Sequence, residues 1–233
     1  MRIQKYLSQQ KILSRREAEN HIREGLIKIN GQIVAQMGVQ IDPEKDRIEI
    51  LKSKKIDKKT TIAVHKPRGI VSSKIKKEGA TVFEIFPQFK NLNVVGRLDK
   101  ESEGLLLLSN DGVITSAVTG SDHLIEKEYQ VTVQENINQA KIKKMEDGMK
   151  INGQMTLPAK TKLLNNRSFL IILKEGKKHQ IRRMCAVLNL TVINLKRLRV
   201  GNVLLKGIQF GSYRVLSNEE VRVLKNLANP VRK

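Results

Sequence analysis

The chain has 233 residues, of which 39% are hydrophobic, enough for one sizeable core and a small appended module. Lys and Arg total 44 against 23 Asp and Glu, so the formal net charge is +21. That charge is far above what solubility requires and has the sign that a phosphate backbone attracts. We therefore expect a polyanionic partner, nucleic acid above all, although a lysine surplus can also be a solvated surface.

Several other classes of protein are disfavoured by the same composition. The first five residues lack the apolar core of a signal peptide, and no later stretch reaches the roughly 18 apolar residues of a membrane span. We therefore expect a cytoplasmic protein with no membrane contact. The single cysteine, Cys185, excludes an intramolecular disulfide framework, and its simplest role is a small buried side chain on a helix. The four histidines show no metal-ligand spacing, so we expect no metal.

The first 50 residues predict a helix followed by a hairpin. Ser14 and Glu17 have the spacing of a capping box, and Gly25 stands where the helix is expected to end, which predicts a helix from about 15 to 24. Asn30-Gly31 then separates two short apolar runs, the strongest short-range signal for a hairpin.

Three basic residues of this segment are candidate RNA contacts. Arg15 and Arg16 open the predicted helix and Lys28 lies on the hairpin, where spacing alone fits RNA contacts and exposed solubilising residues equally well. The sequences Leu-Ser-Arg-Arg-Glu-Ala at 13–18 and Gly-Leu-Ile-Lys-Ile-Asn-Gly at 25–31 resemble the small RNA-binding module of ribosomal small-subunit protein four. This resemblance implies that the module binds RNA.

A charged linker predicts the domain boundary. Residues 52–59 read Lys-Ser-Lys-Lys-Ile-Asp-Lys-Lys and are nearly devoid of apolar side chains, so we place the boundary near residue 58, between domains 1–58 and 59–233. Short apolar runs that predict strands follow at 62–64, 92–95, 105–108, 129–133, 170–173, 192–195 and 203–205. They alternate with helical segments, which predicts an α+β fold: a mixed, mostly antiparallel sheet with flanking helices.

Asp99 is the first candidate for chemistry. The segment 93–99 runs from a strand into a glycine-containing loop, and the apolar run 105–108 follows, so Asp99 is expected in a loop between two core strands. Rigid strands around a short polar loop can hold a reactive side chain in place. The local pattern alone favours a plainer role, a turn in which Asp99 and Ser102 cap backbone amides.

A longer resemblance changes that balance. Residues 96–112, Gly-Arg-Leu-Asp-Lys-Glu-Ser-Glu-Gly-Leu-Leu-Leu-Leu-Ser-Asn-Asp-Gly, closely resemble the signature of the RsuA/RluB/RluE/RluF group of ribosomal RNA pseudouridine synthases. Further matches lie at 66–69, 127–133 and 176–184, so the resemblance covers nearly the whole chain. Ser102 stands where a threonine is common, which preserves the hydroxyl. His123, followed closely by Lys-Glu-Tyr, is most similar to the RluF branch.

The resemblance implies isomerisation of one uridine, expected in large-subunit ribosomal RNA, without an external cofactor. The glycosidic bond breaks, uracil turns within the site, and its carbon 5 is rejoined to the ribose. Asp99 is implied to attack the anomeric carbon or to assist formation of a glycal, and both routes remain open. Arg182 is implied as the counter-ion of Asp99, because a carboxylate in a dry pocket needs an opposing cation. Tyr129 is implied to lie against the base and remove the carbon-5 proton, or else to be an ordinary strand aromatic.

Basic residues are expected to border the RNA. The resemblance implies that Arg97 fills the space left by the flipped-out nucleotide, with phosphate contact as the alternative. Residues 174–206 contain nine Lys or Arg and one Glu, and the expected RNA contacts among them are Lys177, Lys178, Arg183, Lys196, Arg197 and Arg199. Aromatic residues are only 3% of the chain, so recognition should rest on charge and RNA shape. We expect a monomer that binds a structured ribosomal stem-loop, with transfer RNA as a possible second substrate.

Two other functions fit parts of the sequence. A non-catalytic RNA-binding protein of the ribosome or stress response fits the first module and the charge equally well, but Asp99, Tyr129 and Arg182 in matched motifs argue against it. A carboxylate glycosidase needs a second positioned acid, and no motif places Glu101 or Glu103 in that role.

Overall fold

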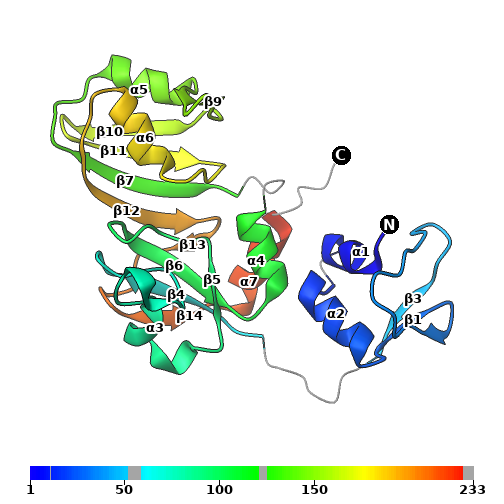
Figure 1. Ribbon diagram of the computed structural model, residues 1–233. Coiled ribbons are helices and arrows are strands. Elements are labelled where there is room, and N and C mark those ends of the chain that lie inside the picture. The colour runs from blue at the N-terminus through cyan, green and yellow to red at the C-terminus, as the bar shows by residue number, and fades with distance from the viewer. Residues whose placement is uncertain (11, 52–58, 121–124, 228–233) are drawn as a thin grey trace.

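The computed structural model describes residues 1–10, 12–51, 59–120 and 125–227. Within these ranges the chain forms a small N-terminal module and a larger α+β domain, with α2 beside α4 (Figure 1). The domain boundary expected near residue 58 and the branch indicator His123 both lie outside the described residues.

The N-terminal module contains the helix and the hairpin that the sequence predicts. Its elements are α1 (Ile3–Gln9), α2 (Arg15–Arg23), β1 (Ile27–Ile29), β2 (Gln32–Ile33) and β3 (Ile48–Ile50). Ser14 and Glu17 form both hydrogen bonds of the capping box that starts α2. Asn30 and Gly31 have φ values of 51° and 82°, the left-handed conformation that a tight two-residue hairpin turn requires. Both predictions for this segment are confirmed.

The larger domain is built on one nine-stranded sheet. Its strands are β4 (Thr61–Lys66), β5 (Asn93–Val95), β6 (Glu103–Ser109), β7 (Lys127–Val133), β10 (Lys160–Asn165), β11 (Ser168–Leu173), β12 (Val192–Val200), β13 (Val203–Leu204) and β14 (Tyr213–Val215). The spatial order is β10-β11-β7-β12-β6-β4-β14, with β13 beside β12 and β5 beside β6. All of these pairs are antiparallel except β12 with β6, which confirms the expected mixed, mostly antiparallel sheet.

Helices cover parts of the sheet and complete the core. They are α3 (Val82–Ile85), α4 (Gly112–Thr119), α5 (Gln139–Glu146), α6 (Gln180–Val187) and α7 (Asn218–Leu227), and a separate hairpin joins β8 (Lys150–Ile151) to β9 (Gln154–Met155). Buried residues of α5 and α6 pack on β7, β11 and β12, whereas those of α4 and α7 pack on β4 and β6. Cys185 is a buried residue of α6, as expected, and burial raises the pKa of its thiol to about 12. No described helix is long and apolar enough to cross a membrane.

Strand β6 is buried on both faces, and it begins directly after the Asp99 loop, which we define as residues 96–102. Leu105 and Leu107 belong to the cluster under α4, whereas Leu106 and Leu108 belong to the cluster beside α3. At its start, Gly104 has a φ of 107°, and a Cβ there would lie 2.3 Å from the backbone oxygen of Arg197. Only glycine therefore allows β6 to approach β12 this closely, which brings Arg197 to the end of the loop.

Candidate active site and RNA interface

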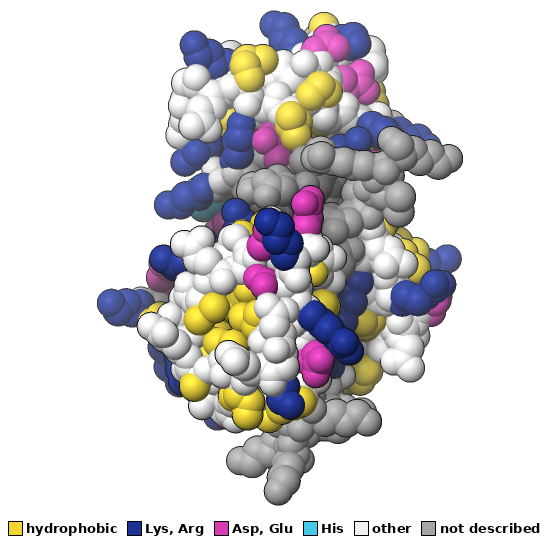
Figure 2. Space-filling view, turned by 90° about the vertical axis from the view of Figure 1, so that its right-hand side faces the viewer, with side chains coloured by type: hydrophobic (Ala, Val, Ile, Leu, Met, Phe, Trp, Pro, Cys, Tyr) yellow, Lys and Arg dark blue, Asp and Glu magenta, His cyan; other side chains and the backbone are white. Residues whose placement is uncertain are grey.

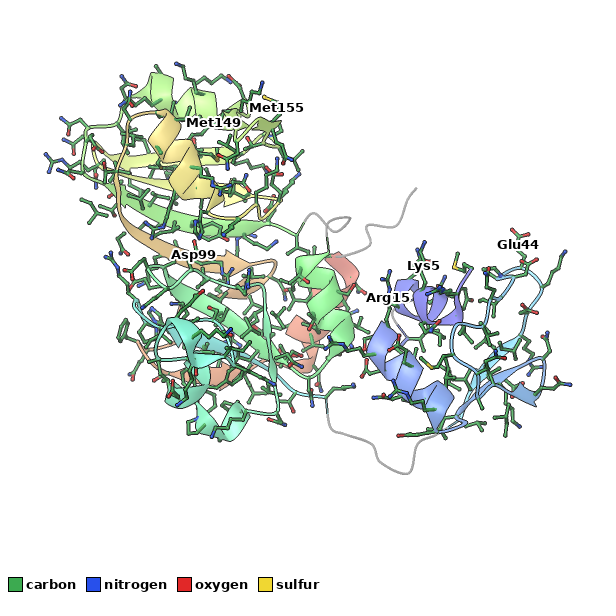
Figure 3. The ribbon with its side chains drawn as sticks, in the orientation of Figure 1. Lys5, Arg15, Glu44, Asp99, Met149 and Met155 are labelled. Atoms are coloured by element: carbon green, nitrogen blue, oxygen red, sulfur yellow. The ribbon has the colours of Figure 1, made fainter. Side chains whose placement is uncertain are left out.

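Asp99 lies where the sequence predicts it, on the loop between β5 and β6. The amide of Ser102 donates to the carbonyl of Asp99 at 3.0 Å, while Leu98 is buried in the cluster beside α3. The carboxylate of Asp99 remains 38% exposed. It accepts no backbone amide within the described part of the chain, so the plainer role as a turn cap is not what the structure shows. Figure 3 places Asp99 between the part of the domain that carries α5 and α6 and the part that carries α3.

Two buried cations hold the Asp99 loop from inside. The guanidinium of Arg197 donates to the carbonyl of Leu105 at 2.7 Å and to that of Gly96 at 2.8 Å. The ammonium of Lys66, at the end of β4, donates to the carbonyls of Pro67 and Ile70 at 2.8 and 2.7 Å, and to that of Lys100 at 3.4 Å. The backbone is therefore fixed at both ends of the segment that presents Asp99.

Arg197 was expected to contact RNA, and this prediction is wrong. Its side chain is only 2% exposed, and both of its hydrogen bonds end on backbone carbonyls of its own domain. The close pairing of β12 with β6 at Gly104 turns this guanidinium into the sheet. A charge count along residues 174–206 cannot reveal this direction.

Burial also shifts the acidity of two lysines near the site. It lowers the pKa of Lys66 to about 8, against the opposing attraction of nearby acidic side chains that include Asp99 and Glu101. It lowers the pKa of Lys127, the first residue of β7, to about 8 as well, and there the charge of Arg197 adds to the effect. Among the described residues, Lys127 donates to one carbonyl, that of Ile125, at 3.2 Å. Both lysines lie in segments that match the family signature, 66–69 and 127–133, but the sequence assigns them no role.

Helix α6 reaches the loop through two side chains. His179, which precedes its first residue, places Nε2 3.4 Å from Oδ1 of Asp99. Arg182 donates instead to the backbone carbonyl of Glu101 at 2.9 Å and makes no ion pair with Asp99 among the described residues. The expected Asp99–Arg182 ion pair is therefore absent from the described residues. Arg182 lies three residues after His179, almost one helical turn, and its guanidinium contacts the loop at Glu101, two residues after Asp99. Sequence reasoning missed His179.

Tyr129 lies on β7 next to the same loop. It is half-buried and packs against the apolar cluster that contains Leu98, the residue before Asp99. Its partner across the sheet is Arg197. Since directly paired residues project to the same face, Tyr129 and the buried guanidinium lie on one side of the sheet.

The other cations that were expected to contact RNA fall into two groups, those with and those without an ion pair inside the protein. Arg97, Lys178 and Arg183 form no ion pair within the described ranges, and the first two are exposed. Ion pairs with acidic side chains join Lys177 to Glu175, Lys196 to Glu103, and Arg199 to both Glu126 and Glu128. These last three cations are already partly neutralised within the protein. Figure 2 likewise shows Lys and Arg side chains spread over the height of one face rather than gathered in one patch.

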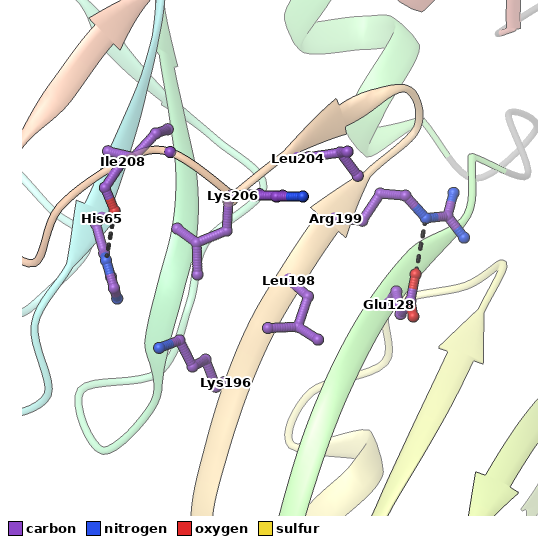
Figure 4. A pocket seen from close by; sticks show the side chains of 10 residues that line it. His65, Glu128, Lys196, Leu198, Arg199, Leu204, Lys206 and Ile208 are labelled. Atoms are coloured by element: carbon purple, nitrogen blue, oxygen red, sulfur yellow. Dashed lines mark hydrogen bonds and ion pairs between the residues drawn. The ribbon is translucent and has the colours of Figure 1, made fainter.

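A pocket of about 470 Å³ lies beside β12, on the other face of the sheet. Glu128 and Lys196 line it, so the adjacent residues Tyr129 and Arg197 project away from it. Figure 4 shows Arg199 at its edge, bound to Glu128 at 2.9 Å. This pocket is therefore separate from the Asp99 loop.

The N-terminal module has its own basic pocket. A space of about 530 Å³ is lined by Met1, Arg2, Gln4, Lys5, Arg15 and Glu19. Arg15 and Arg16 are exposed, and Figure 3 shows Arg15 on the side of the module that faces α4. Arg2 and Lys5 were not among the residues expected from the sequence, because α1 carries no motif that singles them out.

Comparison with known families places both parts of the chain. A model described as RNA pseudouridylate synthase matches residues 60–187, more than half of the chain. The chain belongs to the RNA pseudouridine synthase family. A second model, the S4 domain, matches residues 1–48, which confirms the resemblance of the N-terminal module.

Relatives match this pseudouridine synthase over most of its length. Dual-specificity RNA pseudouridine synthase RluF of Escherichia coli (strain K12) is 35% identical, covering 100% of this chain and 82% of the relative. Ribosomal large subunit pseudouridine synthase B of Bacillus subtilis (strain 168) is 33% identical, covering 98% and 97%. A crystal structure of a pseudouridylate synthase has 31% identity and a TM-score of 0.71 over 96% of this chain and 99% of the other. The protein is thus an isomerase that acts on uridine in RNA, as the resemblance implied.

Proposed function

We propose that this synthase isomerises one uridine within a stem-loop of large-subunit ribosomal RNA, with Asp99 as the reacting carboxylate. The observation that carries this proposal is the placement of Asp99. It lies in the matched signature 96–112, its side chain is partly exposed, and the backbone on either side of it is held by Lys66 and Arg197. The large-subunit assignment is supported by the name of the Bacillus subtilis relative. Transfer RNA as a second substrate remains a prediction, as does the monomeric state.

The reaction exchanges bonds within one nucleotide. The bond from the ribose anomeric carbon to uracil N1 breaks, a bond to carbon 5 forms, the carbon-5 proton leaves, and N1 gains a proton. Asp99, ionised, either adds to the anomeric carbon or removes a ribose proton to give a glycal. Tyr129 lies on the face of the sheet that meets the loop and is our candidate for the base that removes the carbon-5 proton.

RNA binding is divided between the two parts of the chain. Arg15, Arg16 and Lys28 of the S4 domain supply cations away from Asp99, and Arg2 and Lys5 add to them beside Arg15. In the catalytic domain, Arg97 is exposed two residues before Asp99, where a planar cation can occupy the space of a flipped-out base. The peripheral cations therefore position the RNA, while the loop performs the chemistry.

Asp99→Asn tests the catalytic assignment. An amide keeps the shape of the side chain but cannot supply the anionic oxygen, so release of label from uridine carbon 5 should fall below detection while RNA affinity and melting temperature stay unchanged. Asp147→Asn is the matched control, because Asp147 lies at the exposed end of α5 and its one ion pair among the described residues is with Lys143. Turnover by the Asp99 variant within tenfold of wild type would remove Asp99 as the reacting group.

Mapping of pseudouridine identifies the substrate. RNA from a strain that lacks the protein should miss one pseudouridine in large-subunit ribosomal RNA, which wild-type protein restores and the Asp99→Asn variant does not. Small-subunit and transfer RNA from the same strains are sequenced in parallel. A site missing only from either of these would overturn the large-subunit assignment and leave the family assignment intact.

A further inference from the structure

We propose that His179 is a positioning residue for the carboxylate of Asp99. In the RNA-free protein, Nε2 of His179 lies 3.4 Å from Oδ1 of Asp99, and no other cation of the described residues forms an ion pair with this carboxylate. The inference rests on the proposed function in one respect: it takes Asp99 as the reacting group. It adds a residue to which neither the composition nor the matched motifs assigned a role.

The backbone of His179 is unusual for a residue with a side chain. It has φ 55° and ψ 30°, the left-handed conformation, at the N-cap of α6. A residue other than glycine is uncommon in that region, and such backbone strain persists where surrounding structure enforces it, often at functional sites. His179 also makes no side-chain capping hydrogen bond that would explain its presence.

The turn that enforces this conformation is fixed by its neighbours. Gln180 is only 4% exposed; its amide oxygen accepts from the backbone of Lys177 at 3.0 Å, and its amide nitrogen donates to Glu175 at 2.7 Å. On the other side, the amide of Arg183 donates to the carbonyl of His179 at 3.0 Å, which begins the helix. The imidazole is therefore held in place although 46% of its side chain is exposed.

His179 and Arg182 contact different parts of the Asp99 loop. They are three residues apart at the start of α6, so both side chains lie on the face of the helix that meets the loop. Arg182 binds the backbone at Glu101, whereas His179 meets the carboxylate itself. The backbone of the loop is thus held by Arg182, Lys66 and Arg197, and the orientation of the carboxylate is left to His179.

A histidine in this position makes the reaction sensitive to pH. A protonated imidazole attracts a carboxylate by its charge as well as through a hydrogen bond, whereas a neutral imidazole offers only the hydrogen bond, so loss of a proton from His179 weakens its contact with Asp99. Charged groups around the loop include Glu101 and Arg68, bound to each other, together with Arg182, Lys100, Glu103 and the buried Lys66. Burial lowers the pKa of Lys66 to about 8, so its contribution to the pH dependence has to be separated from that of His179.

Four variants separate positioning from other roles. His179→Ala should lower the single-turnover rate at saturating RNA by about tenfold while changing the Kd for RNA by less than about twofold. The variant still binds RNA, but the carboxylate of Asp99 is no longer held in its reactive orientation. His179→Gly should lose the same factor, since glycine tolerates the left-handed backbone and removes only the imidazole. His179→Arg should recover to within about threefold of wild type, since it restores a cation with donors. His21→Gln, on α2, is the control histidine.

The pH dependence gives the readout that a merely structural role would not move. Lys66 is present in wild type and in His179→Arg alike, so the ratio of their rates isolates His179. The ratio of wild type to His179→Arg should fall as pH rises, whereas the ratio of wild type to His21→Gln should stay constant. Melting temperatures of all variants are measured alongside.

Three results would overturn the proposal: an unchanged rate for His179→Ala at saturating RNA, a loss confined to Kd, or equal impairment of the Ala and Arg variants. The proposed function is tested separately by wild type against Asp99→Asn. If those two proteins do not differ, the catalytic assignment of Asp99 fails whatever His179 does.

Discussion

The inside and the rim of the Asp99 loop use positive charge in opposite ways. Inside, Lys66 and Arg197 are buried, and every hydrogen bond described above for them ends on a backbone carbonyl. At the rim, Arg97 and Lys178 are exposed and make no ion pair within the described residues. The inner cations fix the shape of the loop, and the rim cations remain available to RNA. A net charge of +21 is therefore not a count of phosphate contacts.

Removing the inner arginine should have the largest effect. Arg197→Met strips hydrogen bonds from the buried carbonyls of Gly96 and Leu105, and at about 1–3 kcal/mol for each unsatisfied group the free energy of unfolding should fall by about 3 kcal/mol. Turnover should fall with it. Arg199→Met on the same strand loses partly exposed ion pairs with Glu126 and Glu128 and one hydrogen bond to the carbonyl of Gly201, so it should cost about 1 kcal/mol. Urea denaturation of both variants makes the comparison, and equal losses would contradict it.

The two buried lysines, Lys66 and Lys127, sharpen the comparison of buried cations, because both have a pKa near 8 but they donate to different numbers of carbonyls. Within the part of the chain that the structure describes, Lys66 donates to three carbonyls, whereas Lys127 donates to one. Lys127→Met should therefore raise the free energy of unfolding at pH 7 by on the order of 1 kcal/mol, since it removes a poorly compensated buried charge. Lys66→Met should instead lose stability.

The sign of the pH dependence follows from the lowered pKa. Because burial brings the pKa of Lys127 to about 8 from an ordinary 10.5, the unfolded chain binds more protons than the folded protein between these values. This lysine therefore penalises the folded state below pH 8, and the penalty fades as pH rises toward 10.5. The advantage of Lys127→Met should shrink between pH 7 and 10 in urea titrations. An advantage that stays constant over that range would mean that the ammonium is not desolvated.

Much of this architecture could be predicted from sequence wherever the signal is local. The capping box at Ser14, the Asn30-Gly31 turn and the loop around Asp99 are local patterns, and all three lie where predicted. The short hairpin of β8 and β9 was missed although Asn152-Gly153 carries the same turn signal. The edge strands β10 and β14 have no long apolar run to reveal them.

The errors at the site concern the direction of side chains. Arg197 points inward because β6 approaches β12 at Gly104. Its hydrogen bond to Leu105 joins residues that are 92 positions apart in the sequence. His179 meets Asp99 because a turn fixed by Gln180 projects it there. Both facts depend on tertiary packing, which a motif or a charge count does not contain.

At the rim, Arg97 should affect the rate without affecting stability. As the proposed wedge, it offsets the few kcal/mol needed to unstack a paired uridine, so Arg97→Ala should slow a duplexed substrate more than one whose uridine is already unstacked. A difference of about tenfold between the two substrates in single-turnover rates is expected, since each factor of ten corresponds to about 1.4 kcal/mol. Equal slowing on both would leave Arg97 as a phosphate contact or as an organiser of the loop.

The smallest expected effect distinguishes two neighbouring lysines of the rim. Each phosphate contact releases counterions, so removing one contact should reduce the slope of log affinity against log salt by about 0.7–0.9. Lys178 is exposed and forms no ion pair within the described residues, so Lys178→Ala should give nearly this full reduction. Lys177 is 29% exposed and pairs with Glu175 at 3.5 Å, so Lys177→Ala should change the slope less, because part of its charge is already neutralised.

Filter binding of one stem-loop from 50 to 300 mM salt, roughly the range over which such slopes are measured, provides the comparison. Both variants should keep the wild-type melting temperature and the wild-type rate at saturating RNA. Equal slopes for the two variants would show that an ion pair within the protein does not decide which cations reach the phosphates.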